Sequence, residues 1–170
     1  MAITPFNVLA PDIKTADTSI KYRLYYALKR DVDIEEWGKP EAATVSELPM
    51  LPDKYAYFID CRTASVKANA ASAGDIIPTN QPTITADILG ISKDALQLII
   101  DFNGEEMFVI WEHCKSGQKY IAGSSCGALK MTYTKAGTDD SFTGISLQWQ
   151  GTCEAPFYLF DGEVPLEPNP

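Results

Sequence analysis

A succession of strand-length segments with alternating side chains, broken by one helix signal, constrains the fold of this chain most. In the clearest segment, Ile145, Leu147 and Trp149 alternate with small or polar residues. A period of two is typical of a half-buried strand. Segments of this kind, separated by Gly-containing turns, are predicted at Glu106–Glu112, Gln118–Gly123, Leu129–Thr134 and Thr143–Gln150.

The helix signal covers about residues 92–102. Ser92 is a good N-cap, and Asp94 lies favourably near the positive end of the helix. Only Gln97 and Asp101 are clearly polar in the helix body, so we expect this helix to be buried on most sides and to plug the core of a sheet. The predicted fold is mainly β, an antiparallel β-sandwich or barrel with one short α-helix.

The N-terminal half holds further strand patterns. Alternation from Ile20 to Lys29 predicts a first strand, and the other predicted strands are Tyr55–Arg62, with Val66–Ala71 as an extension, and Thr83–Leu89. The small residues 70–74 and the Pro-bounded residues 78–82 predict a loop between the last two.

Two segments lack a periodic pattern. Residues 1–15 predict an extended N-terminal arm, and residues 30–54, rich in Pro and acidic residues, predict a long insert loop. Loops of this length inside a compact domain are uncommon. Two interpretations stay open for the insert: a segment that packs on something, such as a neighbouring subunit, or a surface loop with a short helix near Glu41–Glu47. The length of 170 residues suits a single domain, 1–170.

The segment Met107–Trp111 is apolar on both faces. Such a strand is either central in its sheet or covered by a partner.

Composition narrows the classes of partner. Fourteen basic and twenty-three acidic residues give a formal charge of −9, which opposes generic binding to nucleic acid or anionic membrane. No apolar run is long enough for a membrane span, and no signal-peptide pattern is visible, so synthesis in a cytoplasm is expected. Reduced, mostly buried thiols are favoured for Cys61, Cys114, Cys126 and Cys153.

One motif suggests catalysis. Residues 123–127 match Gly-x-Ser-x-Gly, with Ser125 as the would-be nucleophile. That chemistry requires a turn from a strand into a helix and a downstream His, whereas here a strand pattern follows and the single His is His113, upstream. A Gly-rich hairpin turn is the favoured interpretation, and we expect no enzyme activity.

Other polar groups favour solvated positions. His113 is expected at the surface at a strand end, and Asp139–Asp140 in a turn without the ligand pattern of a calcium loop. Glu35–Glu36 and Glu105–Glu106 are typical of solvating pairs. We therefore expect no metal and no cofactor.

The element order resembles one known family. Ile84–Leu89, Gly90-Ile91-Ser92, the helix to Phe102, the hairpin near Gly117, the strand into Trp149 and the closing Ala155-Pro156-Phe157-Tyr158 resemble tail-tube-like proteins of tailed bacteriophages and prophages. The resemblance covers about residues 83–165. It implies a β-sandwich or barrel related to the tube proteins of contractile injection systems, hexameric rings that stack into a tube, and no active site.

This resemblance implies a structural virion protein, made in the host cytoplasm and then part of the tail. Its partners would be further copies of itself, other tail proteins, and DNA that passes through the lumen without specific binding. The insert 30–54 would correspond to a loop that reaches a neighbour. The candidate subunit interface comprises Phe6, Trp37, Met50, Leu51, Phe108 and Ile110.

A different class stays open. The chain can also be a monomeric β-sandwich binding module for carbohydrate or peptide, with a groove lined by Tyr22, Tyr25, Tyr26, Tyr55 and Tyr57.

Overall fold

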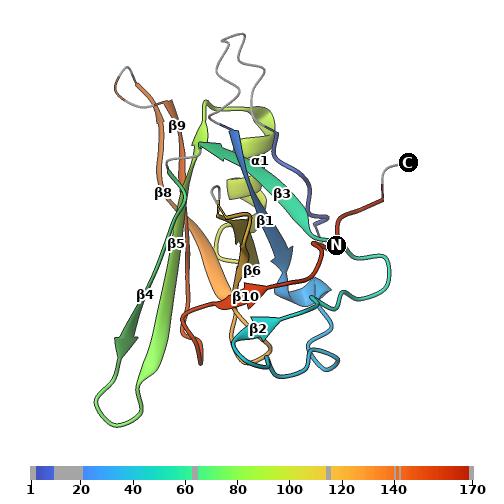
Figure 1. Cartoon of the computed structure of the whole chain (residues 1–170). Helices are drawn as coiled ribbons and strands as arrows, with labels where there is room; N and C mark the ends of the chain where they lie inside the picture. Colours follow the sequence, from blue (N-terminus) through green and yellow to red (C-terminus); the bar gives the residue numbers. More distant parts are fainter. Residues whose placement is uncertain are drawn as a thin grey trace.

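A computed structural model describes residues 3–9, 21–62, 65–113, 116–139, 141 and 143–168. Strands dominate, with one α-helix in the middle of the chain (Figure 1). In chain order the elements are β1 Lys21–Leu28, the 3-10 turn η2 Lys29–Asp31, β2 Thr44–Val45, β3 Tyr57–Arg62, β4 Lys67–Ala73, β5 Thr79–Leu89, α1 Lys93–Phe102, β6 Glu106–Glu112, β7 Lys119–Ala122, β8 Leu129–Thr138, β9 Thr143–Gln150 and β10 Tyr158–Phe160.

The strands join into one ten-stranded sheet with the order β2-β10-β7-β6-β8-β9-β5-β4, and β1 pairs with both β3 and β6. All ladders are antiparallel except that between β10 and β2. In the part of the chain that is described the sheet is not closed into a barrel: β2 and β4 end its main path, and β3 ends the branch through β1. The prediction of a mainly-β fold with one short helix is confirmed.

The larger hydrophobic core lies between two parts of this sheet. Leu24 and Tyr26 of β1 face it from one side, and Ile84 of β5 and Trp149 of β9 from the other. Every second side chain of these strands enters the same core, as the alternating sequence pattern predicts. Helix α1 adds its buried residues Ala95, Leu98, Ile99 and Phe102.

A second core covers the opposite face of β1, β6 and β7. The insert 30–54 supplies much of it, and the bulky rings of Trp37 and Phe108 meet edge to face with centroids 4.8 Å apart. Among the described residues there is no helix at Glu41–Glu47: the strand β2 lies there instead, after two residues with positive φ, Ala42 and Ala43. The insert thus packs on its own chain.

Strand β6 lies between the two cores. Met107, Val109 and Trp111 belong to the first core, and Phe108 and Ile110 to the second. Its neighbours are β1 on one edge and β7 and β8 on the other. The strand is therefore central, which accounts for its two apolar faces without a partner chain.

The loop predicted across residues 70–82 is much shorter than expected. Strands β4 and β5 continue through it as a long hairpin, with Ala73 opposite Thr79 and the turn at residues 74–78. Small residues in β4 and the proline at position 82 suggested a loop. Pro82 is nevertheless accommodated in β5, where its carbonyl accepts a bond from the Gly151 amide. Residues 67–71 of the predicted extension Val66–Ala71 likewise belong to a separate strand, β4, and do not extend β3.

Candidate assembly surface

The β4–β5 hairpin projects from the body of the molecule (Figure 1). Gly74 begins its turn with φ of 102°, and a Cβ there would meet the Ile77 carbonyl oxygen at 2.9 Å. The turn therefore requires glycine. None of residues 69–78 is buried, so the outer end of the hairpin lies outside the two hydrophobic cores.

The hairpin is anchored close to its turn, at the pair formed by Ser72 and Asn80. The Asn80 amide donates to the Cys153 carbonyl at 3.1 Å, and the Cys153 amide donates back at 2.8 Å. The Asn80 side chain adds a bond of 3.0 Å to the Glu154 carbonyl. These bonds hold the turn end of the hairpin against the segment after β9, so the tip is presented at a defined place.

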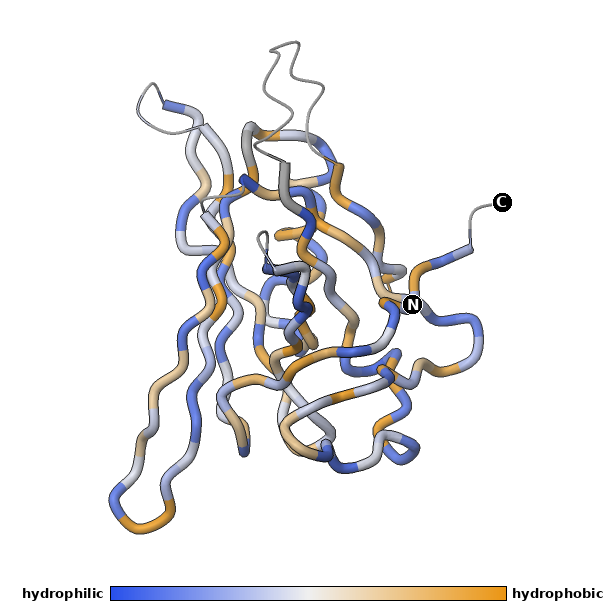
Figure 2. The backbone as a smooth tube through the Cα atoms, viewed as in Figure 1, coloured by the Kyte–Doolittle hydropathy of each residue, from blue (hydrophilic) through white to orange (hydrophobic). Residues whose placement is uncertain are grey.

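Two large apolar side chains occupy that tip. Ile76 is 94% exposed and Ile77 is 78% exposed, next to the exposed Asp75. Figure 2 shows the tip as an apolar point at the end of a more polar hairpin. Scattered single apolar residues on a surface are ordinary, but two adjacent, almost fully exposed isoleucines on a projecting hairpin favour a contact with another molecule.

Helix α1 carries a second exposed apolar pair. Ser92 caps it as predicted, its hydroxyl accepting a 3.0 Å bond from the Ala95 amide. The expectation that the helix is buried on most sides is wrong. Leu96 is 39% exposed and Ile100 is 71% exposed, one turn apart on the solvent side. Lys93 continues the same face, because residues three, four and seven apart share one side of a helix.

The outer face of β5, β8 and β9 is polar. Thr85 of β5 and Thr132 of β8 both lie opposite Gln148 of β9. In the adjacent row the Ser146 hydroxyl donates to Asp87 at 2.7 Å, and Arg62 lies 3.4 Å from the same carboxylate. This face holds hydroxyls, amides and paired charges.

The predicted interface residues do not form one exposed surface. Trp37, Phe108 and Ile110 are buried in the second core of their own chain, and Phe6 and Met50 are half-buried against the two cores. Leu51 alone among the six is exposed to solvent. The hydrophobicity that suggested an interface is used inside the chain, because the insert folds back over β6.

The N-terminal arm is also docked on its own chain over residues 3–9. Val8 pairs with β3, its amide donating to the Phe58 carbonyl and its carbonyl accepting from the Asp60 amide, each at 2.8 Å. Phe6 packs on Phe102 of α1. The remainder of the predicted arm, residues 1–2 and 10–15, lies outside the described residues.

The Gly-x-Ser-x-Gly segment is a hairpin turn, as predicted. Ser124 and Gly127 pair across it, and β8 follows at Leu129. Close packing requires glycine at both positions. A Cβ at Gly123 would meet Phe108 at 2.6 Å, and one at Gly127 would meet the Thr152 carbonyl at 2.7 Å. The motif therefore reflects close approach of neighbouring segments.

The serine that takes part in a polar network is Ser124, which the motif did not single out. It is buried, donates to Glu154 and accepts from the Cys126 amide at 3.2 Å. The Tyr158 hydroxyl donates to the same Glu154 oxygen at 3.0 Å. Burial is the larger cause and this hydrogen bond the next, and together they raise the pKa of Tyr158 to about 12. A carboxylate accepting two hydroxyls ties the turn to the C-terminal segment.

His113 lies exposed after β6, with its Nδ1 3.3 Å from the Ser116 hydroxyl. Asp139 accepts bonds from the amide and hydroxyl of Ser141, while Asp140 lies outside the described residues. Within the described ranges no group of three or more His, Cys, Asp or Glu residues is arranged to hold a metal ion. The three described cysteines, Cys61, Cys126 and Cys153, are free thiols; Cys114 lies outside the described residues.

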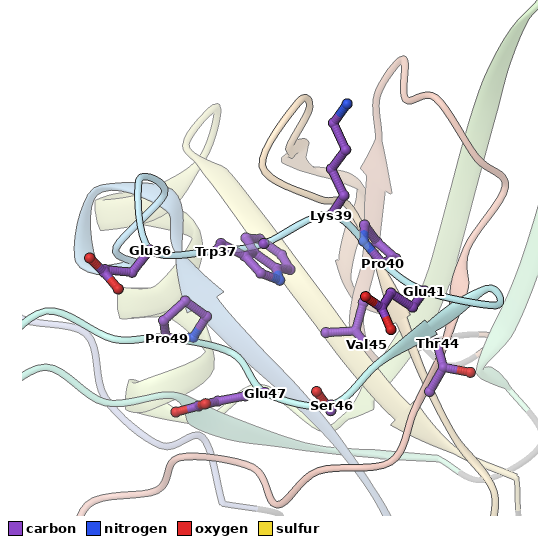
Figure 3. Close-up of a pocket in the computed structure, with 11 residues that line it drawn as sticks. Glu36, Trp37, Lys39, Pro40, Glu41, Thr44, Val45, Ser46, Glu47 and Pro49 are labelled. Carbon is purple, nitrogen blue, oxygen red and sulfur yellow. The ribbon is translucent and has the colours of Figure 1, made fainter.

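The tyrosines proposed for a ligand groove have different surroundings. Tyr26 is buried, Tyr25, Tyr55 and Tyr57 are half-buried, and the Tyr22 side chain lies outside the described part. Tyr26 and Tyr57 pack on each other with ring centroids 6.2 Å apart. A pocket of about 370 Å³ is formed elsewhere, by the insert (Figure 3). Its rim bears Glu36, Glu41 and Glu47 and one amine, Lys39, a mainly acidic lining.

Comparison with protein-family models, with curated proteins and with solved structures found no match to this chain. Within the described residues, α1 is the α-helix of the fold, and no helix has the length and apolar character needed to cross a bilayer.

Proposed function

We propose that this protein is a structural subunit that assembles with copies of itself into rings and tubes, of the kind formed by tail-tube proteins of bacteriophages and prophages. The observation that carries the proposal is the β4–β5 hairpin with Ile76 and Ile77 at its tip. Two exposed isoleucines on a projecting arm have no use inside the chain, and burying them against a neighbour is favourable.

The edge of the sheet supports the same proposal. β4 is the outermost strand beside β5, and it consists mainly of small side chains, Lys67 being its single charged residue. Exposed edge strands normally carry devices that prevent pairing with other chains. Closed cyclic symmetry removes such edges by pairing them with a neighbour.

The polar outer face formed by β5, β9 and β8 suits the wall of a lumen. Threonine, serine and glutamine side chains alternate there, together with the Asp87–Arg62 ion pair and the amines of Lys130 and Lys135. DNA is held by dense clusters of Lys and Arg, so a wall made mainly of hydroxyls and amides would hold it only weakly and let it pass. The assembled tube would act in the virion tail, with other tail proteins at its ends and without cofactor or catalysis.

The test is self-assembly of the purified chain. Sedimentation velocity and negative-stain imaging over a rising concentration series should reveal rings or stacked tubes. The double variant Ile76→Ser/Ile77→Ser should remain a folded monomer, whereas Leu166→Ser, which removes an exposed apolar side chain away from the tip, should assemble normally. A wild-type chain that is strictly monomeric at every concentration would overturn the proposal.

A further inference from the structure

We propose that the hairpin tip of one copy, Asp75–Ile77, docks on the exposed face of α1 of a second copy, formed by Lys93, Leu96 and Ile100. This contact deepens the proposed function and rests on it, because it names the surfaces through which the copies meet. The two surfaces are called the tip and the helix face below.

The tip and the helix face lie at opposite ends of the molecule (Figure 1). Helix α1 packs at one end of the larger core through Ala95, Leu98 and Phe102, while the hairpin points away at the other end. A chain cannot bring its own tip to its own helix without losing the hydrogen bonds that anchor the hairpin at Asn80. If the two apolar pairs meet, they meet between copies.

The two surfaces match in apolar content. The tip offers Ile76 and Ile77, exposed by 94% and 78%, and the helix face offers Leu96 and Ile100, exposed by 39% and 71%. Bringing the pairs together removes four aliphatic side chains from water, and the stabilisation grows with the apolar area buried. A helix face with aliphatic residues one turn apart is a common receptor for such side chains.

The charges beside these pairs have opposite sign. Asp75 precedes the two isoleucines at the tip, and Lys93 precedes Leu96 and Ile100 on the helix face. The two acids of the helix, Asp94 and Asp101, lie about 80–100° around the helix axis from Lys93, so they are outside the helix face. An acid beside one apolar pair and a base beside the other set the orientation of docking and disfavour tip-to-tip or helix-to-helix pairing.

Because the surfaces differ, the contact is heterologous, and each copy has one of each. Heterologous contacts close into a ring or continue as a filament. The contact involves few side chains and is smaller than the roughly 1,000 Å² expected of a stable independent interface. It therefore holds best where a closed assembly makes many such contacts together.

Mixing of two variants tests the heterologous geometry. The tip variant Ile76→Ser/Ile77→Ser keeps its helix face, and the helix variant Leu96→Gln/Ile100→Gln keeps its tip. Each alone should lose assembly, and a one-to-one mixture at high concentration should form species of two copies and no larger. All four positions are exposed, so circular dichroism should show an unchanged fold.

Charge reversal provides an independent test that keeps every apolar side chain. Asp75→Lys or Lys93→Glu alone should weaken assembly by roughly two- to fivefold in the concentration required, the range of an exposed ion pair. The double variant should return toward the wild type. The control pair Asp75→Lys/Lys39→Glu, in which the second change lies in the insert, should stay weak.

The outcomes separate this inference from the proposed function. If wild type and the helix variant assemble equally well, or if the double charge reversal is no better than its two single variants, the docking site is wrong while self-assembly stands. If the wild type is strictly monomeric, both proposals fall. Assembly lost in both apolar variants and restored by the matched charge reversal would support both.

Discussion

The hydroxyl of Tyr26 donates a 2.7 Å hydrogen bond to the Phe6 carbonyl and accepts one of 3.2 Å from the amide of the same residue. The bonded residues are twenty positions apart in sequence. One buried side chain on β1 thus satisfies both backbone groups of an arm residue, and the ring of that residue packs on α1. Tyr26 couples the N-terminal arm to the larger core.

Tyr26→Phe should therefore loosen the arm. It removes both bonds and leaves the Phe6 backbone groups without that partner, a loss of about 1–3 kcal/mol in the free energy of unfolding. Urea denaturation measures the loss, and faster proteolytic cleavage near residues 3–9 would localise it. Tyr133→Phe, at an exposed tyrosine of β8, is the matched control. Equal stability of both variants would contradict this role of the hydroxyl.

Phe108→Ala tests whether β6 is central in its own chain. Phe108 is fully buried, so truncation should lower the free energy of unfolding by about 3–5 kcal/mol. Leu159→Ala, at a partly exposed residue of β10, should change it by about 0.5 kcal/mol or less. Thermal or urea unfolding of the monomer decides the matter. A normally stable Phe108→Ala chain that had lost only assembly would restore Phe108 as an interface residue.

Of the two serines in the turn, Ser124 should matter more for stability than Ser125, although the motif singles out Ser125. Ser124→Ala removes the bonds to Glu154 and from the Cys126 amide, and we expect it to cost about 1–3 kcal/mol. Ser125→Ala should be nearly neutral, since Ser125 is the half-buried central residue of the turn. The comparison is made by equilibrium unfolding. An assay with an ester substrate accompanies it, and activity abolished by Ser125→Ala would contradict the structural interpretation.

Stability should decline at alkaline pH. Burial, the larger cause, and the charge of Glu154 raise the pKa of the Cys153 thiol to about 11. The pKa of the Tyr158 hydroxyl is raised to about 12. A pKa that is higher in the folded state gives stability that is fully present below the ordinary values of 9.0 and 10.0 and is lost as pH rises through the folded values.

The free energy of unfolding should accordingly be flat toward neutral pH and fall from about pH 9 upward. Burial acts in the same direction on the pKa of Tyr26 and of Cys61. Tyr158→Phe and Cys153→Ala should each make the alkaline slope shallower. A slope that neither variant changes would contradict the assignment to these two groups.

Local patterns predicted the regular elements well. The segments Glu106–Glu112 and Thr143–Gln150 are strands with the predicted bounds, and Ser92 caps the helix. These signals are local, since alternation, a cap and a Gly-containing turn act within a few residues. The short strands β2 and β10 carried no such signal. They form because each finds a partner far away in the chain, Val45 beside Phe160.

The candidate site was predicted less well. Phe108 and Ile110 were predicted as interface residues because both apolar faces of their strand must be covered, either by the chain itself or by a partner. The second cover is the insert, whose Trp37 reaches β6 from far away in sequence. The tip residues Ile76 and Ile77 stood in a predicted loop. Nothing in their own sequence shows that β4 and β5 extend beyond the cores.

By itself, the sequence determined the fold class, the capped helix and the absence of a downstream histidine for Ser125, since these depend on residue type and near neighbours. The tertiary structure decided which apolar side chains remain in water. Leu96 and Leu98 of α1 are equally hydrophobic, yet Leu98 is buried and Leu96 is exposed. Burial depends on where distant segments pack, so only the folded chain distinguishes a core residue from a surface that can meet another copy.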